Sequence, residues 1–127
     1  MSFCTVVNCI DGRVQLPVIE FLKKRLNADY VDSITEAEPV HILAGETNRR
    51  QVQSILDRID ISVNKHKSKG IAVAAHHDCA AGSADKAKQL ELLDLSLKFL
   101  RGQFPAVAIL GLWVDENSSV TEIPCPV

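Results

Sequence analysis

Residues with reactive side chains fall into two short stretches that lie far apart in the chain. Cys9, Asp11 and Arg13 alternate in the first stretch, and His76 and Cys79 stand three positions apart in the second. Thiolates and imidazoles are preferred ligands of zinc, and three protein ligands leave the fourth tetrahedral position open to water. The two stretches together predict a zinc site held by Cys9, His76 and Cys79.

The remaining two residues suggest how such a site would be used. Side chains alternate in an extended segment, so Cys9, Asp11 and Arg13 are expected on one side of it. A carboxylate can accept a hydrogen bond from a bound hydroxide, and an arginine can hold that carboxylate through a bidentate pair. We therefore predict Asp11 as the acceptor and Arg13 as the residue that orients it. Two thiolates neutralise the zinc charge, so the bound water should lose its proton only under rather alkaline conditions.

Each of these residues, taken alone, has a more ordinary interpretation. Cys9 and Cys79 could be small buried side chains at strand ends. His76 could be a core histidine with one backbone partner. Asp11 and Arg13 could form a loop ion pair that contributes little to stability. Their joint placement after two strands that are expected to be neighbours favours the metal site.

Other histidines, cysteines and carboxylates are weaker candidates. His77 and Asp78 are rival ligands, although adjacent side chains leaving a strand point in opposite directions. The others are placed as follows: His41 and His66 at the surface, Cys4 in the packing of the sheet, and Cys125 without an assigned role.

The composition is that of an ordinary globular domain, and we expect residues 1–127 to form a single one. The 127 residues are 46% hydrophobic and 24% charged, with 14 Lys+Arg against 16 Asp+Glu and a net charge of −2. No basic stripe or aromatic platform suggests a nucleic-acid partner. No apolar run reaches the length of a membrane span, and the start lacks the pattern of a signal peptide. We expect a cytoplasmic protein with reduced thiols and no membrane partner.

Strand and helix signals alternate along the chain. Strands are predicted over 3–8, 30–34, 70–76 and 106–114, helices over 17–26, 48–67 and 83–101, and a loop over 35–46. Asn48 and Ser83 are predicted as helix N-caps, and Gly70 as a helix stop. Residues 115–118 should form a turn, followed by a returning edge strand over 120–123.

This alternation predicts an α/β fold with a mainly parallel four-stranded sheet. We expect the strand order 2-1-3-4, helices on both faces and a possible antiparallel edge strand near the C-terminus. Ligands of such sheets bind beyond the carboxyl ends of the strands, where the strand order reverses. Both reactive stretches follow strands at such a position, so they are expected to meet.

The ordered pair Cys9-x-Asp11-x-Arg13 and His76-x-x-Cys79 resembles the signature of the β-class carbonic anhydrases. The resemblance implies an α/β protein that holds zinc through Cys9, His76 and Cys79 and uses Asp11 and Arg13 as a catalytic dyad. It implies reversible hydration of carbon dioxide, or of a related small molecule such as carbonyl sulfide, by zinc-bound hydroxide. It also implies a homodimer or higher homo-oligomer. In some members the aspartate becomes a ligand, so Asp11 is a possible fourth ligand of zinc.

The chain departs from the usual family pattern near both motifs. Members commonly have glycine on both sides of the second motif, where this chain has Ala75 and Ala80, and an Arg-Asn-Ala-Gly stretch after the second strand, where residues 32–38 are acidic. The alternative function is therefore a zinc-binding relative with a closed site and a structural or regulatory role. A thiol-redox protein that uses Cys9 and Cys79 is less favoured, because the chain has no C-x-x-C motif.

Overall fold

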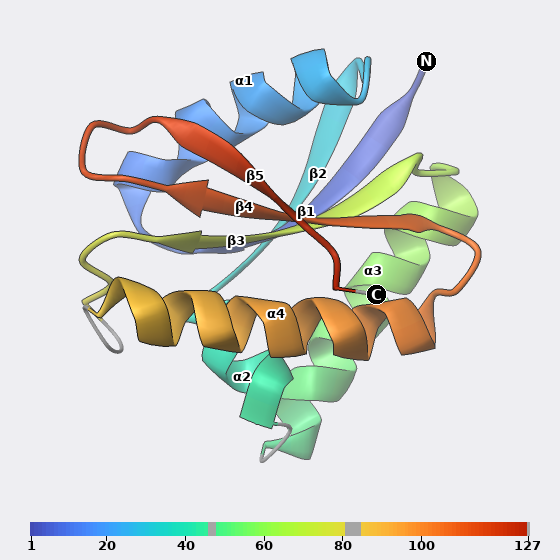
Figure 1. Ribbon diagram of the computed structural model, residues 1–127. Helices are drawn as coiled ribbons and strands as arrows, with labels where there is room; N and C mark the ends of the chain where they lie inside the picture. The colour runs from blue at the N-terminus through green and yellow to red at the C-terminus, as the bar shows by residue number, and fades with distance from the viewer. Residues whose placement is uncertain (46–47, 81–84, 127) are drawn as a thin grey trace.

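A five-stranded sheet forms the middle layer of the fold, in the order β2-β1-β3-β4-β5. The computed structural model describes residues 1–45, 48–80 and 85–126 (Figure 1). The strands are β1 (Phe3–Cys9), β2 (Tyr30–Glu36), β3 (Gly70–His76), β4 (Ala108–Val114) and β5 (Val120–Pro124).

The strand pairing agrees with the topology expected from the sequence. β1 pairs in parallel with both β2 and β3, and β3 pairs in parallel with β4. β5 pairs with β4 in the antiparallel direction, as the returning edge strand. The chain moves outward from β1 to β2 on one side and from β3 to β4 on the other. The switch point of the sheet therefore lies between β1 and β3.

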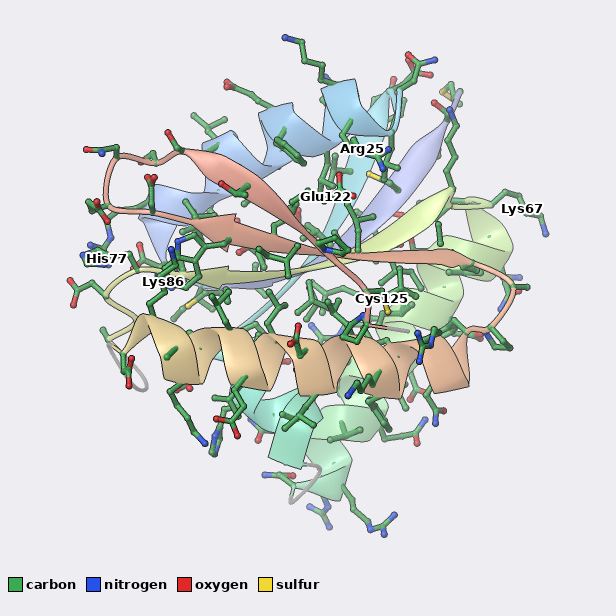
Figure 2. The ribbon with its side chains drawn as sticks, in the orientation of Figure 1. Arg25, Lys67, His77, Lys86, Glu122 and Cys125 are labelled. Carbon is green, nitrogen blue, oxygen red and sulfur yellow. The ribbon has the colours of Figure 1, made fainter. Side chains whose placement is uncertain are left out.

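Helices cover both faces of this sheet, as predicted. The helices are α1 (Gln15–Arg25), α2 (Pro39–Gly45), α3 (Arg49–Lys65) and α4 (Lys86–Gln103), and a short 3₁₀ helix (Gly12–Val14) precedes α1. Figure 1 shows α1 on one face and α2, α3 and α4 on the other. An ion pair joins α1 to the edge strand, with Arg25 Nε 2.6 Å from Glu122 Oε1 (Figure 2). None of the described helices is long and apolar enough to cross a membrane.

Side chains of β1, β3 and β4 alternate between two hydrophobic clusters, one on each face. The α1 side includes Cys4, Val6, Val18, Leu22, Ala72, Ala74, Leu110 and Leu112. The opposite side includes Val7, Leu43, Ile55, Ile59, Ile71, Val73, Leu93 and Leu97. Cys4 is fully buried, as expected, and burial raises the pKa of its thiol to about 11.

The prediction of a loop over 35–46 is wrong. β2 continues to Glu36, and α2 occupies Pro39–Gly45. Proline is well suited to the first turn of a helix, and α2 buries Val40 and Leu43. A short apolar run does not separate helix from strand by periodicity, which is why the sequence left this segment ambiguous.

α3 begins after its predicted cap, but the predicted helix stop is not at the end of a helix. The predicted cap of α3 is confirmed, because Asn48 Oδ1 accepts from the Gln51 N–H at 3.1 Å. Gly70, however, is the first residue of β3, and a Cβ there would lie 3.2 Å from Leu26 Cδ1. Gly70 therefore allows close packing against Leu26 and is not a helix stop.

The other two long helices begin at residues that differ from the predicted ones. Asp85 caps α4, with Oδ1 accepting from the Ala87 N–H at 3.0 Å, while the predicted cap Ser83 lies outside the described residues. The first long helix begins at Gln15, two residues before the predicted start at Pro17. The earlier start brings Gln15 next to the first reactive stretch.

Candidate metal centre

The carboxyl ends of β1 and β3 bring the two reactive stretches together. Cys9 ends β1, His76 ends β3, and Cys79 follows in the turn after β3. The two cysteine sulfurs and a ring nitrogen of His76 all lie within 4.8 Å of one another, and all three residues are buried. A tetrahedral zinc with bonds of about 2.0–2.3 Å would hold such ligands ~3.5 Å apart. Small side-chain movements would therefore suffice for these atoms to bind one ion.

The hydrogen bonding of His76 also suits a metal ligand. Its Nδ1 lies 2.7 Å from the carbonyl oxygen of His77. Since a carbonyl only accepts, Nδ1 must donate, and Nε2 is left as the acceptor of a neutral ring. That Nε2 atom is buried and has no hydrogen-bond partner among the described residues. A backbone carbonyl that fixes the tautomer from behind is a common arrangement around metal-binding histidines.

Asp11 and Arg13 form a tight pair in the loop that follows Cys9. Arg13 Nη2 lies 2.6 Å from Asp11 Oδ2, and Arg13 Nε lies 3.0 Å from Asp11 Oδ1. The backbone N–H of Arg13 also donates to Asp11 Oδ1 at 2.9 Å, which caps the 3₁₀ helix. These bonds from Arg13 lower the pKa of Asp11 to about 2. The carboxyl group is therefore ionised at neutral pH and acts only as an acceptor.

Arg13 also connects the two stretches to each other. Its Nη2 donates to the carbonyl oxygen of Asp78 at 3.1 Å, and its Nη1 lies 3.5 Å from Asp78 Oδ2. Asp78 has a φ of 56°, in the left-handed region that aspartate enters more readily than most residues. This turn points the Asp78 carbonyl toward Arg13, so the guanidinium spans both loops.

Two polar residues that the sequence analysis did not select support the first stretch. Asn8 is buried in β1, where its Oδ1 accepts from the Cys9 N–H at 2.9 Å and its Nδ2 donates to the Val14 carbonyl at 3.1 Å. Gln15 Nε2 donates to the carbonyls of Cys9 at 2.7 Å and Asp11 at 3.1 Å. An amide at the end of an apolar strand was a usable signal for Asn8. Gln15 carried no comparable signal.

The rival ligands lie outside the cluster. The ring of His77 is about half exposed, with Nδ1 3.9 Å from Glu116 Oε2, and the Asp78 side chain faces Arg13. Figure 2 shows His77 at the carboxyl end of β3, and Cys125 far from it beside α4. His41 is exposed, and His66 pairs with Asp32 at 2.7 Å near the surface, as expected for both.

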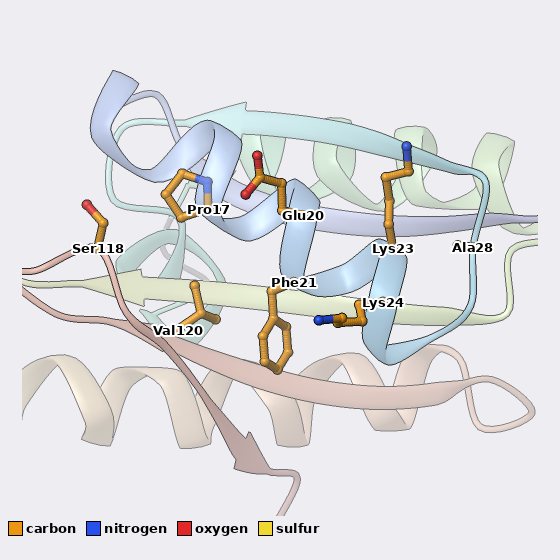
Figure 3. A pocket seen from close by; sticks show the side chains of 8 residues that line it. All are labelled: Pro17, Glu20, Phe21, Lys23, Lys24, Ala28, Ser118 and Val120. Atoms are coloured by element: carbon orange, nitrogen blue, oxygen red, sulfur yellow. The ribbon is translucent and has the colours of Figure 1, made fainter.

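A small hollow adjoins the cluster on the α1 side of the sheet. It measures about 190 Å³, and its lining includes Arg13, His76 and residues of the turn between β4 and β5. A larger open groove of about 800 Å³ lies along α1, lined by residues such as Phe21, Lys24 and Val120 (Figure 3). None of the residues that line this groove is Cys9, His76 or Cys79. The larger volume therefore does not mark the candidate metal centre.

Comparison with protein families identifies the chain. Residues 1–124 match the model of the family described as "Putative carbonic anhydrase". The chain therefore belongs to this carbonic-anhydrase-like family, and the resemblance noted in the sequence is confirmed. No match was found among curated proteins.

Solved structures of β-carbonic anhydrases share this fold. One of two tetrameric β-carbonic anhydrases from the filamentous ascomycete Sordaria macrospora matches with a TM-score of 0.59 and 13% identity, over 95% of this chain and 80% of its own. A β-carbonic anhydrase of the fungal pathogen Aspergillus fumigatus matches with a TM-score of 0.56 and 16% identity, over 94% of this chain and 74% of its own. At these identities the likeness establishes the fold alone.

Proposed function

We propose that this chain is a zinc-dependent hydratase of the carbonic-anhydrase type, which reversibly hydrates carbon dioxide or a related small molecule. The buried Nε2 of His76 carries the proposal. It lacks a partner among the described residues, and His76 lies with Cys9 and Cys79 in the cluster that brings two thiols and a ring nitrogen together. A buried acceptor without a partner is costly, and a metal ion would remove that cost.

The donor set fits zinc better than the common alternatives. Two thiols and an imidazole suit zinc, whereas magnesium and calcium prefer oxygen ligands. Bound zinc would supply a Lewis acid that makes water a nucleophile at accessible pH. Cys9, His76 and Cys79 would hold the ion and leave one position for that water.

Asp11 and Arg13 would orient the reacting water. Because the Asp11 carboxyl group is ionised at neutral pH and paired with Arg13, Asp11 accepts a hydrogen bond and cannot donate one. If Asp11 accepted a hydrogen bond from the water, a lone pair of the water oxygen would be left to face the carbon of the substrate. Arg13 is anchored on Asp78 as well, so it would hold the carboxylate in one orientation through the reaction.

The alternative is a closed zinc site in which Asp11 is the fourth ligand. To become one, the carboxylate must give up its side-chain bonds with Arg13 and its cap on the 3₁₀ helix. The observed pairing therefore favours an open site and a hydratase over a purely structural or regulatory zinc protein.

We also propose that the protein is a homo-oligomer, a homodimer or larger. The family resemblance and the tetrameric relative from Sordaria macrospora support this assembly. The family resemblance also supports carbon dioxide as the substrate. The cytoplasmic location stays a prediction from the sequence.

Two measurements test the proposed function. Metal analysis of the purified chain should find about one zinc per chain, and stopped-flow assays above pH 8 should find carbon dioxide hydration. Asp11→Ala should keep the zinc and lose most of the activity. Wild-type protein that holds zinc but is as inert as Asp11→Ala would contradict the hydratase proposal and favour the closed site.

A further inference from the structure

Gln15 makes two contacts to the backbone of the first reactive stretch. It is the first residue of α1 and is half-buried. Its amide nitrogen lies 2.7 Å from the carbonyl oxygen of Cys9 and 3.1 Å from that of Asp11. An amide nitrogen carries two hydrogens, so each carbonyl can receive one. The opposite amide orientation would place oxygen against two acceptors, so the acceptors assign the donor.

These contacts fix the backbone on both sides of Ile10. Ile10 is 63% exposed, so packing does little to hold this residue, although its N–H donates to the Glu36 carbonyl at 3.0 Å. The Asp11 carbonyl also accepts from the Val14 N–H at 3.2 Å, which closes the 3₁₀ turn. Gln15 thus ties the start of α1 to the residue that supplies a thiol and to the residue that supplies a carboxylate.

We propose that Gln15 is a positioning residue of the metal centre, which directs the Cys9 thiol and the Asp11 carboxylate by holding the carbonyls of these two residues. The effect of Gln15 on metal binding rests on the proposed function. Its two hydrogen bonds to the carbonyls of Cys9 and Asp11, which we call the clamp, are present in the metal-free chain. Residues that support metal ligands from behind commonly account for about 10- to 100-fold in metal affinity.

The chain offers two informative variants and a matched control. Gln15→Glu keeps the size of the side chain but places an acceptor-only carboxylate against two carbonyls. Gln15→Met keeps the length and removes the donors without adding charge. Gln51→Glu makes the same chemical change at an exposed residue in the first turn of α3, away from the two stretches.

Amide hydrogen exchange in the metal-free protein tests the clamp directly. The Arg13 N–H is bonded to Asp11 Oδ1 and the Val14 N–H to the Asp11 carbonyl, so both report on this loop. In Gln15→Glu both should exchange about tenfold faster, the size expected when hydrogen bonds of this kind are lost. Gln15→Met should change in the same direction and decides the matter if Gln15→Glu does not fold. Unchanged exchange in the folded variants would overturn the proposal.

Zinc affinity, measured by competition with a chelator, tests the positioning role without an activity assay. Gln15→Glu and Gln15→Met should bind zinc at least about tenfold more weakly than wild type, and Gln51→Glu should bind as wild type does. Equal affinity in all variants would overturn the proposal. Wild-type protein that binds no zinc would instead contradict the proposed function, and the exchange experiment would still decide the clamp.

Discussion

The pKa of the Asp11 carboxyl group is lowered mainly by one neighbour, Arg13. Hydrogen bonds from the Arg13 side chain and backbone lower the pKa of Asp11 to about 2, so its ordinary titration near pH 4 is displaced to more acid conditions. Any stabilisation from this pair is fully present above the ordinary pKa near 4 and is lost as the pH falls from about 4 to about 2. The dyad is therefore expected to be fully formed wherever a zinc hydratase would operate.

Arg13→Gln should raise the pKa of Asp11 toward its ordinary value near 4, because the side-chain bonds that hold the carboxylate are lost. Titration of the Asp11 carboxyl carbon by NMR in the metal-free protein measures the shift. Arg58→Gln, which removes a similar arginine from Glu36 on the β2 edge, is the control and should leave Asp11 unchanged. An Asp11 pKa that stays near 2 in Arg13→Gln would refute the assigned cause.

Cys9→Ser should reduce zinc to well below one ion per chain, because an alcohol is a far weaker zinc ligand than a thiolate. Cys125→Ser is the matched control, since Cys125 lies beside α4 with its sulfur 3.8 Å from the Leu97 carbonyl. Zinc content of the purified variants is the measurement. Equal loss of zinc in both variants would show that Cys9 is not a specific ligand.

The elements that position the site differ in how well the sequence revealed them. β1, β3 and β4 are apolar and largely buried, so their signals were clear. The two motifs that begin at the ends of β1 and β3 could therefore be placed at the carboxyl end of the sheet. α2 was missed because a helix of 7 residues has too few turns for a periodic signal. The role of Gln15 was missed because it depends on the 3₁₀ helix over Gly12–Val14, after which α1 begins at Gln15 and not at Pro17.

Close packing of α4 against the sheet supplies a prediction at the scale of elements. A Cβ added at Gly111 in β4 would lie 2.9 Å from Leu97 Cδ1 and 3.0 Å from the Ile123 carbonyl oxygen, which belongs to the paired strand β5. Gly111→Ala should therefore lower the free energy of unfolding by about 1–3 kcal/mol, measured by urea denaturation.

Gly102→Ala is the matched control for that substitution. Gly102 lies in α4, and a Cβ there would meet nothing within 4 Å. Alanine favours a helix over glycine, so this variant should gain roughly 0.5–1 kcal/mol. Equal effects of the two substitutions would contradict the packing described for β4.

At the scale of the molecule, the metal centre would join two segments that are distant in sequence. Cys9 ends β1, whereas His76 ends β3 and Cys79 lies in the turn after it, so an ion bound to all three should stabilise the sheet at its switch point. Added zinc should raise the thermal midpoint of wild type, because binding to the folded state stabilises it by mass action. In Cys9→Ser the midpoint should respond much less. A similar rise in both proteins would indicate zinc binding elsewhere.

Zinc-edge X-ray absorption of the purified protein tests the central claim most directly, because it counts the ligands by element. Cys9, His76 and Cys79 predict two sulfurs at about 2.3 Å and two lighter atoms at about 2.0–2.1 Å, one of them an imidazole nitrogen. In Asp11→Ala the spectrum should be unchanged if the fourth ligand is water. A zinc shell without sulfur, or a chain that binds no zinc, would contradict the account.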